Sequence, residues 1–265
     1  MARRTDSGEL ECIKPTESFW YLYYIQNPLL EDNKFLTKFR GRFRLPYSQF
    51  EELVADCKSS DLFKRWQGCD AMGRPSTPME LLVLGSLRYL GRGWTFDDIE
   101  ESTAVSQEVH QNFFHVFINF GSTTLYDRYV RFPSNYEEAK RHMREFAMAG
   151  LPGCVGSTDA THIVTWACKY NLRNYHLGGK SKATTRSFNM TCNHRRRILH
   201  STRGGPGRWN DKTMVLFDRF VKGIRDGDVL EDVEFDLTNN DCEVSRWLCY
   251  LQQWLPQVVC NCASV

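Results

Sequence analysis

Residues 153–163 read Gly-Cys-Val-Gly-Ser-Thr-Asp-Ala-Thr-His-Ile and hold the most informative pattern of the chain. A Gly/Pro cluster precedes them, and Cys154–Asp159 predicts a short β-strand that carries a carboxylate, Asp159, at its end. An acid in that position is held rigidly at the edge of a sheet. Asp159 is therefore the first candidate site residue.

The segment that follows predicts a hairpin and then a helix. Residues 187–192 and 197–202 read as two strands joined by a short turn, and Asn210 or Asp211 caps a helix that runs to about Lys222. A strand with a terminal Asp, a hairpin and a helix follow one another in this order at the start of a ribonuclease-H-like domain. In such a domain clustered carboxylates hold two Mg²⁺ ions.

The charges of the chain are distributed very unevenly. Its formal net charge is +2, but residues 160–210 contain ten Lys or Arg residues and no Asp or Glu. The ten cations are Lys169, Arg173, Lys180, Lys182, Arg186, Arg195, Arg196, Arg197, Arg203 and Arg208. Such a run predicts a surface that binds the phosphates of DNA, because neutralised phosphates release counterions. The alternative is a solvated basic face with no ligand.

The first 150 residues predict an all-helical region. Phe35, Phe39 and Phe43 recur at a spacing of four and mark one helix face, and Ser48 is a candidate cap for the next helix. Three helices are expected between about residues 72 and 121, the last two joined by a three-residue turn. This arrangement predicts a helix-turn-helix-like unit.

The chemistry of this unit leaves its role open. It carries Arg74, Arg88 and Arg92 against six acids, and its third expected helix contains no Lys or Arg. Gln107, Gln111 and Asn112 could read base edges, but a packed three-helix unit without DNA contacts explains the sequence equally well.

The whole sequence predicts an α+β protein with two domains. Residues 1–150 form the helical region, and the Gly/Pro cluster at residues 149–153 separates it from a ribonuclease-H-like mixed α/β domain at 151–265. The ten cysteines lack the density of a disulfide framework, so most are expected to be reduced. A zinc site is the alternative, with Cys192/His194 and Cys260/Cys262 as the close pairs, but their spacing is shorter than structural zinc pairs use.

The sequence also predicts where the protein works. No run of apolar residues is long enough for a membrane helix, and the first residues lack the apolar core of a secretion signal. A nuclear location, or a cytoplasmic one before import, is expected, with no membrane partner.

The segment around Asp159 resembles the start of the nuclease domain of PIF/Harbinger-type DDE transposases. Further stretches that are similar to this family are Tyr170–Leu172, Phe188–Asn189, Gly207–Asp211, Gly73–Pro75 and Leu87–Leu90. The resemblance extends from about Phe43 to Asp241.

The resemblance implies a cut-and-paste DNA transposase or a domesticated relative that uses Mg²⁺ or Mn²⁺. Asp159 would be the first metal-binding acid and Asp211 either an auxiliary ligand or only a helix cap. His162 could position a phosphate, although a structural role fits it better. The family commonly acts with a separate Myb-like DNA-binding protein, which is therefore an expected partner besides DNA itself.

The resemblance ends near Asp241. The family continues with a strand that ends in Asp-x-Gly-Tyr and later with a helix that bears a Glu, and the sequence shows neither. Such an ending suggests a frameshift, a mis-spliced gene model or a decayed element, and hence an incomplete C-terminal domain. Two functions follow: a metal-dependent DNA endonuclease or strand-transfer domain that is inactive as this chain, or a DNA- or protein-binding remnant without catalysis.

Overall fold

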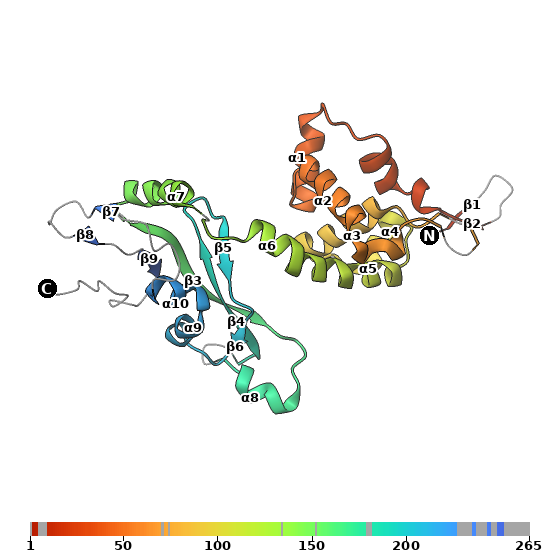
Figure 1. Ribbon diagram of the computed structural model, residues 1–265. Coiled ribbons are helices and arrows are strands. Elements are labelled where there is room, and N and C mark those ends of the chain that lie inside the picture. The colour runs from red at the N-terminus through yellow and green to blue at the C-terminus, as the bar shows by residue number, and fades with distance from the viewer. Residues whose placement is uncertain are drawn as a thin grey trace. The chain divides into compact units, whose positions relative to one another are not determined.

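The computed structural model forms two compact units, residues 1–125 and 126–265, and each is described separately (Figure 1). The structure describes residues 2–4, 10–69, 72–73, 75–133, 135–151, 153–178, 182–226, 235–236, 243–244 and 248–251. The division falls upstream of the Gly/Pro cluster, so the charged helix that precedes this cluster belongs with the sheet.

The first unit is built from helices. Its main elements are α1 (Asn33–Phe43), α2 (Tyr47–Ser59), α3 (Met79–Arg92), α4 (Phe96–Thr103) and α5 (Gln107–Phe120). Shorter pieces are the strand pair β1 (Ala2–Arg4) and β2 (Leu10–Cys12), the 3-10 turns at Pro15–Glu17 and Asp61–Trp66, and π-helical turns at Tyr21–Gln26 and Gly121–Leu125.

Aromatic residues dominate the core of this unit. Phe35, Phe39 and Phe43 are buried as their spacing predicts, and their rings surround that of Tyr24. Arg88 is buried too, with its guanidinium 3.9 Å from the centre of the Trp94 ring. Arg88 is therefore occupied within the core of the unit.

The helices of this unit begin in different ways. Thr95 and Asp98 form a reciprocal capping box at the start of α4, and Ala104 ends that helix in the left-handed conformation. Ser48 does not cap α2 as predicted, because the helix begins one residue earlier at Tyr47, directly after Pro46. Proline fixes its own φ and confines the residue before it to extended backbone, so the chain enters the helix at this point.

The second unit combines helices with a sheet. Its helices are α6 (Tyr126–Tyr129), α7 (Tyr136–Met148), a 3-10 turn at Tyr170–Leu172, α8 (Arg173–His176), α9 (Asp211–Phe217) and α10 (Arg219–Asp226). Its strands are β3 (Cys154–Val164), β4 (Thr185–Cys192), β5 (Ile198–Ser201), β6 (Gly205–Pro206), β7 (Phe235–Asp236), β8 (Glu243–Val244) and β9 (Leu248–Leu251).

The main sheet has the strand order β5-β4-β3-β9, and β6 pairs with the opposite end of β4 from β5. The β4–β5 hairpin confirms the two predicted strands, and β3 and β4 are also antiparallel. β9 is parallel to β3 and pairs with its first half, Cys154 to Thr158. The class is therefore α+β, as expected.

The predicted helix after the hairpin is divided in two. Asn210 caps α9, as one of the two predicted alternatives, but the helix ends at Phe217 instead of continuing to Lys222. Asp218 then adopts extended backbone, and its carboxylate accepts hydrogen bonds from the N–H groups of Phe220 and Val221 at the start of α10. A short acid side chain that caps a new helix is a sufficient reason for the break.

The helices α7 and α10 pack around the start of β3. Val155 is fully buried among Ala139 of α7 and the apolar side of α10, which consists of Phe220, Val221 and Ile224. Within the described part of the chain, no helix is long and apolar enough to cross a membrane.

Candidate nucleic-acid interface

Asp159 lies in the middle of β3, not at its end as predicted. The strand continues to Val164 because Thr161–Val164 find partners in Thr185–Phe188 of β4. The β-branched residues of this stretch favour a strand. The carboxylate of Asp159 is exposed, and one of its oxygens accepts a hydrogen bond of 2.9 Å from the N–H of Ala160.

The pleat of the sheet fixes the direction in which Asp159 points. Thr158, its neighbour, is hydrogen-bonded to Thr191 of β4 on the buried face of the sheet. That face is covered by α9, since the hydroxyl of Ser187, four residues from Thr191, lies 3.0 Å from the sulfur of Met214. Successive side chains of a strand alternate between faces, so Asp159 lies on the opposite, exposed face.

Asp211, the second predicted acid, is exposed at the first turn of α9. It follows the cap Asn210, whose side-chain oxygen accepts the N–H of Thr213 at 2.8 Å. Because α9 covers the buried face of the sheet, Asp211 and Asp159 belong to opposite faces. The strand β6, which leads into α9, pairs with Arg186 and Ser187. Those residues lie roughly 10–13 Å along β4 from the partner of Asp159.

The structure therefore does not bring the two predicted acids together. Among the described residues, no group of three or more His, Cys, Asp or Glu side chains is arranged to hold a metal ion. Cys57, Cys69, Cys168 and Cys192 are free thiols. The second close pair considered for zinc, Cys260/Cys262, lies outside the described residues. The metal-binding roles of Asp159 and Asp211 stay predictions.

His162 lies on β3, and its side chain contacts the neighbouring strand β4. Its Nδ1 atom lies 3.3 Å from the hydroxyl of Thr185 on β4. This contact fits the structural role that was preferred for His162 over a phosphate contact.

All the predicted DNA-contacting cations that the structure describes are exposed, and Lys180 lies outside the described residues. Two of them have acidic partners on α7: Arg195 forms an ion pair with Glu145, and Arg197 lies 3.8 Å from Glu138. In the described part of the chain, the others form no ion pair. These are Lys169, Arg173, Lys182, Arg186, Arg196, Arg203 and Arg208.

This difference divides the basic segment, residues 160–210, into two groups. Arg195 and Arg197 attach the turn of the β4–β5 hairpin to α7, while the remaining cations lie in the connection between β3 and β4, on β4 itself, at Arg196 of the β4–β5 turn and in the segment after β5. The latter group is the one that meets the requirement for a phosphate-binding surface, which is positive charge without internal neutralisation.

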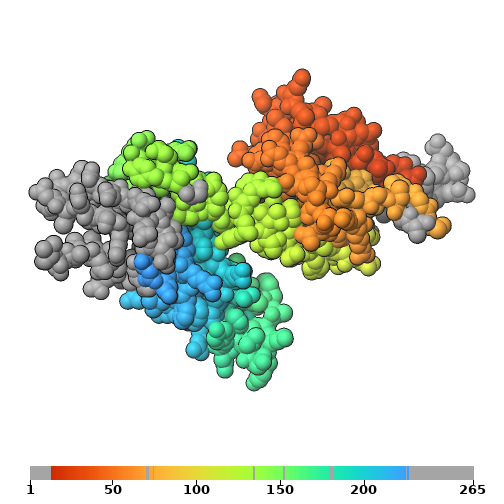
Figure 2. Space-filling model, viewed as in Figure 1, coloured from red at the N-terminus to blue at the C-terminus, as the bar shows by residue number. Residues whose placement is uncertain are grey.

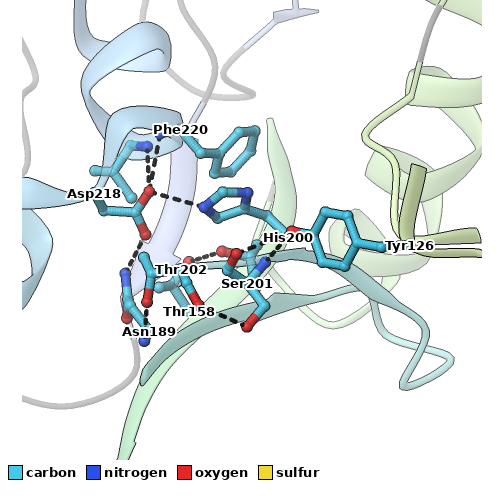
Figure 3. A network of polar contacts seen from close by, with 10 residues as sticks. Tyr126, Thr158, Asn189, His200, Ser201, Thr202, Asp218 and Phe220 are labelled. Atoms are coloured by element: carbon cyan, nitrogen blue, oxygen red, sulfur yellow. Dashed lines mark hydrogen bonds and ion pairs between the residues drawn. The ribbon is translucent and has the colours of Figure 1, made fainter. Parts of the chain in front are cut away.

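Asp218 is a polar residue of this unit that the sequence pattern did not single out (Figure 3). It is fully buried between α9 and α10, and its two oxygens serve different partners. One accepts from the backbone N–H of Phe220 at 2.9 Å and lies 3.1 Å from Nε2 of His200, and the other accepts from the side-chain amide of Asn189. The His200 ring also stacks on that of Phe220.

The surroundings of Asp218 decide its charge. Burial alone would raise the pKa of this carboxyl, but His200, Asn189 and the N–H of Phe220 more than offset burial and hold the pKa below its ordinary value of 3.8. Asp218 is therefore a buried carboxylate whose oxygens are engaged by the protein. It fixes α10 to the β4–β5 hairpin and is not available to a ligand.

The strand β9 lies beside β3, on the side away from β4. Its four residues are Leu-Cys-Tyr-Leu, and Val244–Val265 contain no Asp or Glu. The printed sequence therefore offers no carboxylate on this strand next to Asp159.

Comparison with known proteins yields one similarity that bears on this surface. No family model matches the chain, and no solved structure matches it. The chain is 23% identical over 203 residues to Protein ALP1-like of Arabidopsis thaliana, which covers 76% of this chain and 48% of that protein. It thus spans about half the length of the curated relative it matches. This similarity suggests the Harbinger transposase-derived family, whose motifs the Asp159 segment resembles.

Proposed function

We propose that this chain is a DNA-binding protein of transposase descent, and that the basic segment is its DNA-contacting surface. The observation that carries the proposal is that most of the cations in this segment are exposed and form no ion pair. Residues 160–210 contain no acid, and seven of the described cations in it are exposed without an ion pair. Charged side chains arranged in this way bind the DNA backbone independently of base sequence.

The topology of the second unit supports the transposase part of the proposal. β3, the β4–β5 hairpin, the helices α9 and α10, and then β9 follow in the order that a ribonuclease-H-like domain begins with. The similarity to Protein ALP1-like, over three quarters of this chain, supports the same descent.

The described residues fit the divalent metal of a DDE nuclease poorly. Mg²⁺ requires several oxygen ligands, and two-metal sites place the ions about 3.5–4 Å apart. Asp159 and Asp211 are on opposite faces of the sheet, β9 has no acid, and Asp218 is buried with its oxygens engaged. We therefore propose binding, and derive no cleavage step.

Metal-dependent DNA cleavage is the second candidate function, favoured by one observation. Asp159 is exposed on the same face of the sheet as Arg186, so that a carboxylate and a free cation would both face a bound DNA backbone. In this reading Asp159 would be the first ligand of Mg²⁺ or Mn²⁺, and the other ligands would come from outside the described residues.

We propose that the helix-turn-helix-like unit, residues 72–121, does not supply the main phosphate contacts. Arg88, one of its three cations, is buried against Trp94, and Asp97, Glu101 and Glu108 are exposed on α4 and α5. A helix-turn-helix of this kind suits contact with a separate protein. A Myb-like DNA-binding partner and a nuclear location are proposed from the family resemblance.

Binding to a blunt 20-base-pair duplex, measured by fluorescence anisotropy, tests the proposal. The triple variant R186Q/R196Q/R203Q removes three cations that form no ion pair and is expected to weaken binding by about tenfold or more at 0.1 M salt. The matched variant R195Q/R197Q removes two cations already paired with α7 and is expected to change affinity much less. Equal losses in both variants would contradict the assigned surface, and no binding by the wild-type chain would contradict the function.

Incubation of the same duplex with Mg²⁺ or Mn²⁺ separates the two candidate functions. DNA binding without cleavage is the expected result. Cleavage that disappears in Asp159→Ala, while the binding of DNA by this variant is retained, would instead establish the nuclease.

A further inference from the structure

The segment between β3 and β4 exposes aromatic rings to an unusual degree. We call the described residues 165–178 and 182–184 the lobe; it projects beyond the end of the sheet, with α8 at its tip (Figures 1 and 2). Trp166 is 98% exposed and Tyr170 is 91% exposed. Aromatic side chains of this size usually bury most of their surface, so two rings left almost bare on one short segment mark a contact surface.

The lobe is anchored to the sheet at its base. The backbone N–H of Thr165 donates to the carbonyl of Thr184 at 2.8 Å, and the hydroxyl of Thr184 donates to the carbonyl of Thr165 at 2.9 Å. Nδ1 of His176 lies 3.2 Å from the carbonyl of Thr185. These contacts hold both ends of the lobe, so Trp166 and Tyr170 are presented from a fixed base.

Positive charge accompanies the exposed rings. Lys169 lies between Trp166 and Tyr170 in the sequence, and Arg173 follows at the start of α8; both are exposed and form no ion pair among the described residues. Arg208 reaches the lobe from the turn after β6, and its guanidinium lies 5.7 Å from the centre of the Tyr175 ring.

Bare aromatic rings interleaved with cations match the chemistry of unpaired nucleotides. A base that is not stacked in a duplex exposes an apolar face to an aromatic ring, while its phosphate requires a cation nearby. In a duplex the bases are stacked on one another, so their faces are closed to Trp166 or Tyr170. A protein surface without nucleic acid would not require the acid-free composition of residues 160–210.

We propose that the lobe binds unpaired DNA nucleotides, with Trp166 and Tyr170 stacking on bases while Lys169, Arg173 and Arg208 contact the phosphates. This inference rests on the proposed DNA-binding function and adds the structural class of DNA to it. The DNA that the full chain prefers is then a duplex with a single-stranded end or gap. The hairpin cations hold its paired part, and the lobe holds its unpaired part.

Three DNA probes that differ in one feature test the inference with the full chain. The first is a blunt 20-base-pair duplex, the second carries in addition a ten-nucleotide dT overhang, and the third carries a ten-nucleotide abasic overhang with the same phosphates and no bases. Wild-type protein is expected to bind the dT overhang about tenfold or more tightly than the abasic one, because stacking requires a base.

The variant W166A/Y170A is expected to lose this preference and to keep the affinity for the blunt duplex. W166F/Y170F should retain most of the preference, since each position keeps an aromatic ring. The control Y136A removes an exposed ring of α7, outside the lobe, and should leave all three affinities unchanged. Thermal unfolding of each variant establishes that the fold is retained.

The outcomes separate this inference from the function on which it rests. Equal affinity of the wild-type protein for the dT and the abasic overhangs would overturn the stacking role while leaving DNA binding in place. A loss of blunt-duplex binding in W166A/Y170A as large as the loss on the overhang would also overturn it. No binding to any of the three probes would overturn both the inference and the proposed function.

Discussion

Asp218 joins α10 to the β4–β5 hairpin inside the second unit. Its buried carboxylate accepts hydrogen bonds from the side chain of Asn189 and from two backbone N–H groups of α10, and lies 3.1 Å from Nε2 of His200. Asp218→Asn keeps the shape but turns an amide toward the amide of Asn189 and removes the charge beside His200. The expected loss in unfolding free energy is about 2–4 kcal/mol, measured by urea unfolding. Asp211→Asn, an exposed acid at the start of α9, is the control, with an expected loss below about 1 kcal/mol.

The contribution of Asp218 should also depend on pH. Its pKa in the folded chain is held below 3.8, so the folded state binds fewer protons than the unfolded state as the pH falls below that value. The stabilisation is complete above the ordinary pKa and is lost as the pH falls through the lower, folded one. The stability difference between wild type and Asp218→Asn should accordingly narrow below pH 3.8. A difference that stays constant down to the acid transition would contradict the charged state of Asp218.

His110 gives the first unit a pH dependence in a different range. It is buried between α3, α4 and α5, with Nε2 2.9 Å from the hydroxyl of Thr103, and burial lowers its pKa from 6.5 to about 4. Between these values the unfolded chain takes up a proton that the folded chain does not, so stability falls as the pH falls. A loss of roughly 3 kcal/mol is expected between pH 6.5 and pH 4.

Two substitutions on the same helix check the assignment to His110. In His110→Gln no group titrates at this position. The unfolding free energy of the first unit, measured by chemical denaturation at several pH values, should therefore depend less on pH than in the wild type. His115→Gln changes an exposed histidine of α5 and should keep the wild-type profile. Identical profiles for all three proteins would exclude His110 as the source.

At the scale of the elements, Gly207 allows the turn after β6 to pack closely against β4 and α8. A Cβ atom at this position would overlap the backbone oxygens of Thr185 and His176, and neither can move without displacing β4 or α8. Gly207→Ala is therefore expected to cost about 1–3 kcal/mol and to open the lobe to trypsin at Lys169 and Arg173. Gly41→Ala, in the last turn of α1, is the control, because a Cβ atom there meets no atom within 4 Å. That change should leave stability equal or slightly higher. Unchanged cleavage of the lobe in Gly207→Ala would contradict the close packing.

The elements show which features the sequence could predict. The phenylalanine spacing of α1, the capping residue Asn210 and the β4–β5 hairpin are all local signals, and the structure confirms them. The length of β3 was not predictable in this way, because Thr161–Val164 become a strand only through pairing with β4. The break at Asp218 depends on His200 and Asn189, which are distant in the sequence.

The sequence predicts the positive charge of the candidate site but not the positions of its side chains in space. The absence of acids from residues 160–210 is visible in the sequence alone. The faces of the sheet that Asp159 and Asp211 occupy follow from the register of β3 and β4, and the neutralisation of Arg195 and Arg197 follows from their contact with α7. Such relations arise from tertiary packing, which no local pattern encodes.

At the scale of the whole molecule, the small net charge of +2 conceals a basic segment of +10. Charge of one sign concentrated on an exposed hairpin and lobe raises the local concentration of a polyanion and speeds its encounter with the protein. The central claim is that this surface binds DNA.

The salt dependence of DNA affinity tests this claim most directly. The dissociation constant of the full chain for a blunt 20-base-pair duplex would be measured between about 0.05 and 0.2 M NaCl. If several of the unpaired cations contact phosphates, the logarithm of the association constant should fall linearly with the logarithm of the salt concentration, with a slope of roughly −3 to −6. A slope near zero, or no binding at the lowest salt, would contradict the claim.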